Sequence, residues 1–107
     1  TENGVPVPDG KDFDGKVRDF RRIRYVRDNL TEIHRAIEDD VPVQGYFHWT
    51  LTDNFEWAYG CTMRFGLVHI DFATLQRTMK ESGRWFAQVI RDNGLDPGAS
   101  GLPFFPR

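Results

Sequence analysis

Cysteine is nearly absent from this sequence of 107 residues. The single Cys61 cannot form a disulfide within the chain, and no zinc-ligand spacing is present. No apolar run approaches the ~20 residues that span a bilayer, and the sequence shows no signal peptide. The formal net charge of −2 gives no electrostatic reason to expect nucleic acid or a membrane surface as a partner. We therefore expect no metal and no cofactor, and a cytoplasmic rather than a secreted protein.

Aromatic side chains, in contrast, are abundant. They make up 14% of the residues, and many of them lie between Tyr46 and Phe72. Such a density is typical either of a tight core or of a surface that stacks on flat ligands. Hydrophobic residues at 39% and charged residues at 28% are the balance of an ordered chain, and the length allows one domain at most.

The first half of the chain predicts a loop and then a helix. Prolines and glycines break residues 1–16, so we expect a long loop after a very short start. Residues 17–39 carry apolar side chains at steps of three and four, with Arg and Asp on the other face, which predicts an amphipathic helix. These apolar positions are Val17, Phe20, Ile23, Val26, Leu30, Ile33 and Ile37. Asp39, Asp40 and Pro42 should end the helix.

The second half predicts strands and one more helix. Val43–Leu51 is short and nearly continuous in apolar character, which is typical of a strand covered on both faces. Within the irregular residues 52–76, Phe65–Phe72 alternates well enough to form a strand, with a turn at Ala73 and Thr74. A helix should run from about Gln76 to Asn93, with Gly94 as its C-cap.

This order of elements is an α/β pattern with only one complete strand. A buried parallel strand needs parallel neighbours, and the sequence offers none, so we interpret the chain as a piece of a larger fold. The alternative is a small autonomous α+β domain, which would require Phe65–Phe72 to pair with Val43–Leu51.

Three motifs resemble family 1 of the glycoside hydrolases. TENG, at residues 1–4, resembles the end of that family's seventh strand, where the Glu is the catalytic nucleophile. GYFHWTLTDNFEW, at residues 45–57, is similar to the eighth strand and the loop after it. RFGLVHIDFATLQRTMKESGRW, at residues 64–85, resembles the segment that follows. The helix between them keeps the family's spacing of Asp19, Arg22 and Tyr25, and the resemblance ends near residue 95.

The resemblance implies the C-terminal quarter of a (β/α)8 TIM barrel. Residues 1–95 would supply the end of strand 7, helix 7, strand 8 and helix 8, and residues 96–107 an irregular tail. It also implies a retaining β-glycosidase, which needs two carboxyl groups about 5–5.5 Å apart. No cofactor is part of that chemistry.

The resemblance assigns roles to five residues of this chain. Glu2 would be the nucleophile, Trp49 the platform beneath the sugar, and Glu56 the acceptor of two sugar hydroxyls. Trp57 would donate its indole N–H to a third oxygen, and Phe65 would line the pocket. Core packing is the alternative for Trp49, Trp57 and Phe65, since that is the usual fate of aromatic side chains.

The resemblance also implies a partner. The acid/base glutamate belongs to an N-terminal segment of the same barrel that this sequence does not contain, so we expect that segment and a β-glycoside substrate as partners. A non-catalytic carbohydrate-binding or structural fragment of the same fold is one alternative, and transglycosylation is another. Thr50, Thr52, Cys61 and Asn29 depart from the family's usual residues, but none of them has an assigned contact with the sugar.

Four further polar residues have expected roles outside the sugar site. Asn3 should hold the turn after Glu2 through local hydrogen bonds. Asp53, together with Asn54, should tie down its own loop by side-chain to backbone bonds. Strand alternation should turn His48 away from the barrel interior.

Overall fold

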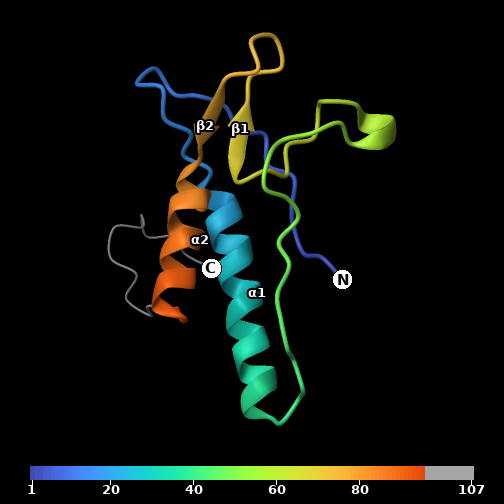
Figure 1. Cartoon of the computed structure of the whole chain (residues 1–107), viewed down its shortest axis with the longest axis vertical. Coiled ribbons are helices and arrows are strands. Elements are labelled where there is room, and N and C mark those ends of the chain that lie inside the picture. Colours follow the sequence, from blue (N-terminus) through green and yellow to red (C-terminus); the bar gives the residue numbers. More distant parts are fainter. Residues whose placement is uncertain (96–107) are drawn as a thin grey trace.

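A long amphipathic helix, α1 (Phe20–Glu38), dominates the computed structural model, which describes residues 1–95 (Figure 1). Its apolar spacing predicted it, but it begins three residues later than expected. Val17 is buried ahead of the helix, and its carbonyl oxygen accepts a hydrogen bond from the Glu81 N–H at 2.9 Å. The backbone before α1 is therefore tied to another helix and not to a first helical turn. Asp40, with a φ of 62°, turns the chain back after Glu38.

A hairpin and a second helix replace the single helix predicted over residues 76–93. The strands β1 (Val68–Ile70) and β2 (Arg77–Met79) pair antiparallel, and α2 (Glu81–Asp92) follows directly. The turn predicted at Ala73 and Thr74 is present, because the Asp71 carboxylate accepts hydrogen bonds from the N–H groups of both residues. Residues 77–79 therefore form a hairpin strand, although their composition would also allow a helix. At the other end Asn93, not Gly94, is the left-handed C-cap residue.

The predicted strand Val43–Leu51 is wrong as a regular element, although the segment is extended. It makes one parallel bridge, between Asn3 and His48, and the bridge Thr52–Val68 follows it. In Figure 1 the segment runs back along α1 from the C-terminal end of that helix. Within residues 1–95 the neighbouring segments are too short to build a ladder along its edges, so the backbone is extended without forming a sheet. The pairing with Phe65–Phe72 that a small autonomous domain required is limited to the Thr52–Val68 end.

Side chains alternate along this extended segment as they would along a strand. Tyr46 and His48 pack against Phe86 of α2, with ring centroids 6.1 and 6.0 Å apart. The half-buried side chains are those of Tyr46, His48 and Thr50, and the exposed ones are those of Phe47, Trp49 and Leu51. One side of the segment is therefore covered by the helices, and His48 lies on that side, as alternation predicted.

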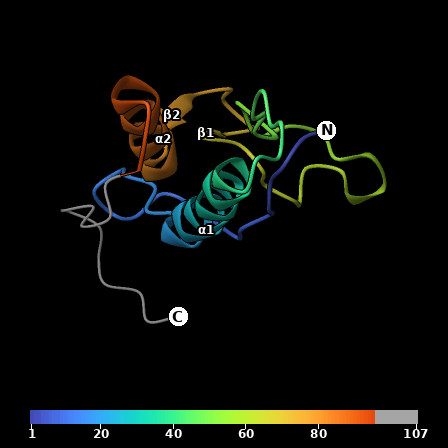
Figure 2. The same cartoon turned by 90° about the horizontal axis from the view of Figure 1, so that it is seen from below.

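The opposite side of the segment is uncovered by the described residues. The loop that follows, which includes the single 3-10 turn η1 (Trp57–Tyr59), projects away from α2 in both views (Figures 1 and 2). Large apolar side chains are exposed along both stretches: Phe47, Trp49, Leu51, Phe55, Trp57 and Tyr59. We call these six residues the open apolar surface. They contrast with a small core made of Val7, Val17, Ile23, Val26, Leu67 and Ile70.

Neither α1 nor α2 is long and apolar enough to cross a bilayer. The predicted irregular tail, residues 96–107, lies outside the residues that the structure describes.

Candidate active site

The segment that carries Glu2 is docked closely against Trp49. The Asn3 N–H donates to the Phe47 carbonyl at 2.9 Å, and the Trp49 N–H donates to the Asn3 carbonyl at 2.9 Å. A Cβ atom at Gly4 would lie 2.1 Å from the Trp49 carbonyl oxygen, so only glycine allows this approach. The short motif at residues 1–4 thus has a structural reason for its last residue. Glu2 itself is exposed, and its carboxylate accepts a bond from the Thr1 hydroxyl at 3.0 Å.

The prediction that Asn3 makes local turn contacts is wrong. Its side-chain amide donates to the Tyr25 hydroxyl at 3.2 Å and to Asn29 Oδ1 at 3.4 Å, both on α1. Its Oδ1 accepts a bond from the Tyr46 hydroxyl at 2.7 Å. Turn chemistry was a reasonable expectation for an Asn before a Gly, but partners that lie 22 to 43 positions away cannot be read from spacing.

Trp49 and Glu56, two of the predicted sugar-binding residues, are in direct contact. The Trp49 indole Nε1 donates to Glu56 Oε1 at 3.0 Å. The Glu56 backbone is held in turn by the Gly60 carbonyl, which accepts its N–H at 2.7 Å. Trp57 follows at the start of η1 with 85% of its surface exposed, so packing against the described residues does not explain this side chain. The Trp49–Thr50 peptide bond is cis.

Phe65 lies beside this group through its backbone. Its carbonyl oxygen accepts the Thr50 N–H at 3.3 Å, and its side chain is half-buried. Glu2, Trp49, Glu56, Trp57 and Phe65 are therefore linked through short chains of contacts among residues 2–4, 47–57 and 65. Their roles toward a sugar remain predictions.

Asp53 ties down its loop, as predicted, but it does more than that. Its carboxylate accepts hydrogen bonds from the N–H groups of Gly66 at 3.0 Å and Ile70 at 3.3 Å. It also pairs with Lys80 at 2.9 Å and with Arg64 at 2.6 Å. Burial raises the pKa of Asp53, but the hydrogen bonds and charges of these two cations outweigh burial and hold the pKa below its usual value.

Sequence reasoning missed the ion-pair cluster to which Asp53 belongs. Lys80 Nζ bridges Asp53 and Asp9, with the Asp9 oxygen at 2.8 Å. Arg22 continues the cluster by pairing with Asp9 at 2.8 Å and with Asp19, whose carboxylate also binds Ser82. Three carboxylates thus meet three cations in a charge-balanced group, the anions being Asp9, Asp19 and Asp53 and the cations Arg22, Arg64 and Lys80. The cluster joins the loop after Glu2 to the loop that bears Glu56.

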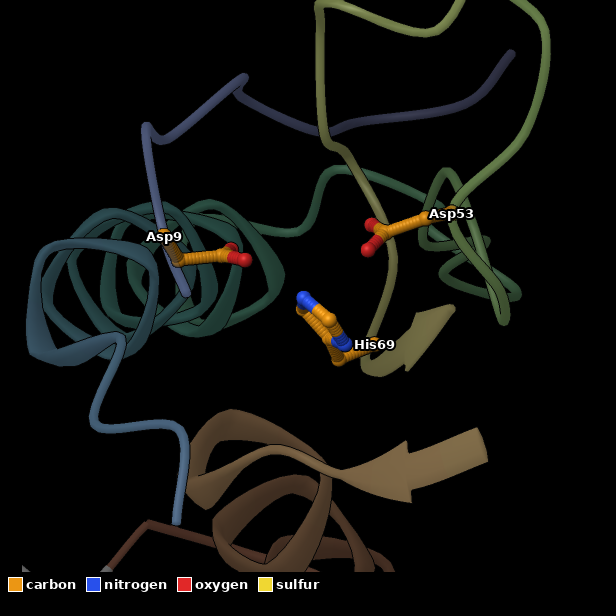
Figure 3. A group of neighbouring side chains, drawn as sticks. All are labelled: Asp9, Asp53 and His69. Carbon is orange, nitrogen blue, oxygen red and sulfur yellow. The ribbon is translucent and has the colours of Figure 1, made fainter. Parts of the chain in front are cut away.

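The side chains of Asp9, Asp53 and His69 converge from three separate segments and are residue types that bind metals (Figure 3). Lys80 Nζ, however, contacts both carboxylates and supplies the positive charge that a metal ion would bring. Burial, followed by the charge of Arg64, lowers the pKa of His69, which keeps its imidazole neutral. Because Lys80 already balances both carboxylates, we interpret Asp9 and Asp53 as members of the ion-pair cluster, with His69 beside it, and not as ligands of a metal centre.

The profile of Glycosyl hydrolase family 1 matches residues 1–95 of this sequence. The chain belongs to glycosyl hydrolase family 1.

Individual members of family 1 agree with this assignment. Beta-glucosidase A of Acetivibrio thermocellus is 50% identical over 95 residues, which cover 89% of this chain and 21% of that enzyme. The 1,4-beta-D-glucan glucohydrolase of Thermotoga neapolitana is 50% identical with the same coverage. The solved structure of the family 1 β-glucosidase from Thermotoga maritima superimposes with a TM-score of 0.88 at 45% identity, over 90% of this chain and 22% of that one.

The chain spans about a fifth of the length of the family 1 relatives that it matches. The prediction of a piece of a family 1 TIM barrel is therefore confirmed. The position of that piece within the barrel, and the roles of the five site residues, belong to the proposal that follows.

Proposed function

We propose that this chain forms the C-terminal quarter of a retaining β-glycosidase, in which Glu2 is the nucleophile and Trp49, Glu56, Trp57 and Phe65 bind the sugar. The observation that carries the proposal is the parallel bridge between Asn3 and His48. It makes residues 2–4 and the extended segment 43–51 adjacent parallel elements, as the ends of barrel strands 7 and 8 would be.

This bridge also favours a common side for Glu2 and Trp49. Residues opposite each other in a bridge project to the same side, so Asn3 and His48 share the helix-covered side. Each neighbour in sequence then projects to the other side, where Phe47 and Trp49 are exposed. Glu2 and the Trp49–Glu56 pair accordingly face the region in which a sugar would bind.

The chemistry needs a second carboxyl group from elsewhere in the barrel. Glu2 attacks the anomeric carbon while an acid protonates the departing oxygen, and a water molecule then hydrolyses the glycosyl ester with the same group acting as base. The first bond forms from Glu2 to the sugar as the glycosidic bond breaks, and the second step restores the free carboxylate with net retention. The acid/base glutamate would come from the N-terminal segment of the barrel.

The open apolar surface supports the need for that segment. Six large apolar side chains gathered on two consecutive stretches are more than a soluble monomer usually leaves uncovered. The remaining strands of a barrel would cover part of this surface and leave the rest to line the sugar pocket. The apolar stripe of α1 also supports this need, because α2 lies beside the N-terminal half of α1 (Figure 1) while Ile37 in its last turn remains exposed.

Glu56 and the two tryptophans suit a neutral sugar. A carboxylate can accept two hydroxyl hydrogen bonds, and an indole can donate one while its ring covers an apolar sugar face. The Trp49–Glu56 hydrogen bond of 3.0 Å holds these groups together before any ligand arrives. Glucose is the expected glycone, with galactose or fucose tolerated.

Covalent trapping tests the proposal in the assembled enzyme, that is, this chain together with the rest of its barrel. An activated 2-deoxy-2-fluoro β-glucoside should add one glycosyl group to Glu2, because the fluorine slows both formation and hydrolysis of the ester while the activated leaving group restores the rate of formation alone. Peptide mass spectrometry locates the adduct. Glu38→Gln, on the exposed end of α1, is the control that should label normally. An adduct on another carboxylate, or reversible binding without any adduct, would favour the non-catalytic carbohydrate-binding alternative.

A further inference from the structure

We propose that Asn3 is the positioning residue of the nucleophile, fixing the direction of Glu2 through a hydrogen-bond network that reaches into α1. The inference rests on the proposed role of Glu2. It assigns to Asn3 a part in the reaction that needs no contact with the sugar.

Every hydrogen-bonding group of Asn3 is engaged. Its backbone N–H and carbonyl bind Phe47 and Trp49, both at 2.9 Å. Its side-chain nitrogen donates twice and its side-chain oxygen accepts once, and the three partners are Tyr25, Asn29 and Tyr46. Two of these partners lie one turn apart on α1 and the third lies on the extended segment. An amide held from both directions has one possible orientation.

The network is itself rigidly held. Asn29 Nδ2 donates to the Tyr25 carbonyl at 2.8 Å, which fixes its Oδ1 as the acceptor facing Asn3. Burial raises the pKa of Tyr46 to about 12, so its hydroxyl keeps its proton and stays a donor to Asn3. The helix that carries Tyr25 and Asn29 is anchored in the core by Ile23 and Val26.

Glu2 has much less support of its own. It is exposed, and its carboxylate bonds to the neighbouring Thr1 hydroxyl. Its direction therefore depends on the backbone of the next residue, and that residue is the most completely bonded one in the motif. In a displacement reaction a shift of ~1 Å in the attacking atom can cost on the order of 100-fold in rate.

A double-mutant comparison in the assembled enzyme separates positioning from a general structural role. The four enzymes are the parent, Asn3→Ala, Glu2→Gly and the double variant. The parent and Asn3→Ala are compared on an aryl β-glucoside, where we expect Asn3→Ala to lower kcat by about 100-fold with little change in KM. Gln44→Ala, which removes an exposed amide from the same extended segment, is the matched control and should keep parent activity.

Glu2→Gly and the double variant are compared with added azide. The azide ion attacks the anomeric carbon as the aryl oxide leaves, which gives the inverted glycosyl azide. No carboxylate needs to be aimed in this reaction, so Asn3→Ala should change its rate by less than twofold. An equal loss of rate in both backgrounds would show that Asn3 merely holds the fold, and would overturn the inference. Parent-level turnover by Glu2→Gly without azide would instead overturn the proposed nucleophile.

Tyr46→Phe provides a second route if Asn3→Ala does not fold. It removes one donor to Asn3 Oδ1 and keeps the aromatic ring that packs on Phe86. Loss of one ordinary hydrogen bond corresponds to a decrease of about 2- to 10-fold in kcat, again without effect on the azide reaction. Unchanged kcat in a folded Tyr46→Phe enzyme would contradict the network as the positioning device.

Discussion

The two sides of the extended segment Val43–Leu51 have opposite surroundings. On one side Tyr46 and His48 pack on α2, and Tyr46 also reaches Asn3. On the other side Phe47 and Leu51 are exposed to solvent, and Trp49 meets Glu56. The covered side is rich in contacts between distant parts of the chain, whereas the open side carries the residues predicted to act on a sugar. The described residues therefore support the candidate site from behind but do not enclose it.

The largest effect on folding should come from expressing this chain without the rest of its barrel, which leaves the open side uncovered. We expect the isolated chain to aggregate or to lack a cooperative thermal transition, because six large apolar side chains remain exposed. Coexpression with the N-terminal part of the barrel should yield one soluble complex. Light scattering and calorimetry provide the measurement. A monodisperse 12.5 kDa species that melts sharply would contradict the expectation.

Removing the Glu2 carboxylate should abolish turnover and leave the fold unchanged. In the assembled enzyme, Glu2→Gln should lower kcat on an aryl β-glucoside by roughly 10⁴-fold or more, since an amide cannot form the glycosyl ester. Circular dichroism and the melting temperature should match the parent, because the Glu2 carboxylate bonds to the side chain of its own neighbour Thr1. Wild-type turnover by this variant would place the nucleophile elsewhere.

The largest loss of folding stability should come from replacing Lys80 in the buried ion-pair cluster. Its side chain is fully buried and bridges Asp9 and Asp53, so Lys80→Met would leave two buried carboxylates with one cation fewer. Removal of one partner from such a group costs about 3–5 kcal/mol. The free energy of unfolding of the assembled enzyme in urea measures this loss.

The matched control for Lys80→Met is Arg18→Met. Arg18 also contacts two carboxylates, those of Asp12 and Asp14, but its side chain is 37% exposed. Exposed pairs contribute about 0–1 kcal/mol, so the control should be nearly neutral. Similar losses from both variants would mean that burial of the Lys80 cluster adds nothing.

The smallest of these effects concerns the charge of the sugar. A phosphate on the glycone would approach the Glu56 carboxylate, and the nearest cation in sequence, Arg64, is already paired with Asp53 at 2.6 Å. At an effective dielectric constant of about 20, this repulsion should favour p-nitrophenyl β-glucoside over its 6-phosphate by roughly 10²- to 10³-fold in kcat/KM. Glu56→Gln should narrow the difference. A preference for the phosphorylated substrate would show that Glu56 lies away from that part of the pocket.

The sequence could predict features that depend on local patterns, but not those that depend on partners far away in the chain. The helix over residues 20–38 was predictable because its apolar spacing is a property of the segment itself. The start of α2 was not, because Lys80 is held by Asp9 and Asp53, which lie 71 and 27 positions away. The sequence alone does not distinguish a buried lysine that bridges two carboxylates from a lysine on a solvated helix. Composition therefore favoured one continuous helix over residues 76–93, where the chain forms the second hairpin strand and then α2.

The same division applies to the site. The contact between Trp49 and Glu56 agrees with roles that the motif suggested, since both lie in one short stretch of sequence. The amide network of Asn3 could not be predicted, because its three partners come from two other segments. The sequence alone thus suggested the residues that we propose to face the sugar more readily than the residues that hold them in place.

Gly4 lies so close to Trp49 that a side chain at position 4 should displace the residue that we propose as the sugar platform. Any side chain there would need the Trp49 carbonyl to retreat from 2.1 Å to beyond 3.0 Å, and the indole would move with its backbone. Gly4 has no functional group, but its replacement would then lower the affinity for a sugar by displacing Trp49. When binding of a neutral sugar-like inhibitor is measured, Gly4→Ala should weaken it as substitutions of Trp49 do. Substitutions of the exposed Pro6 should leave this binding unchanged. The position of the proposed platform therefore depends on residue 4 having no side chain, a condition that glycine alone meets.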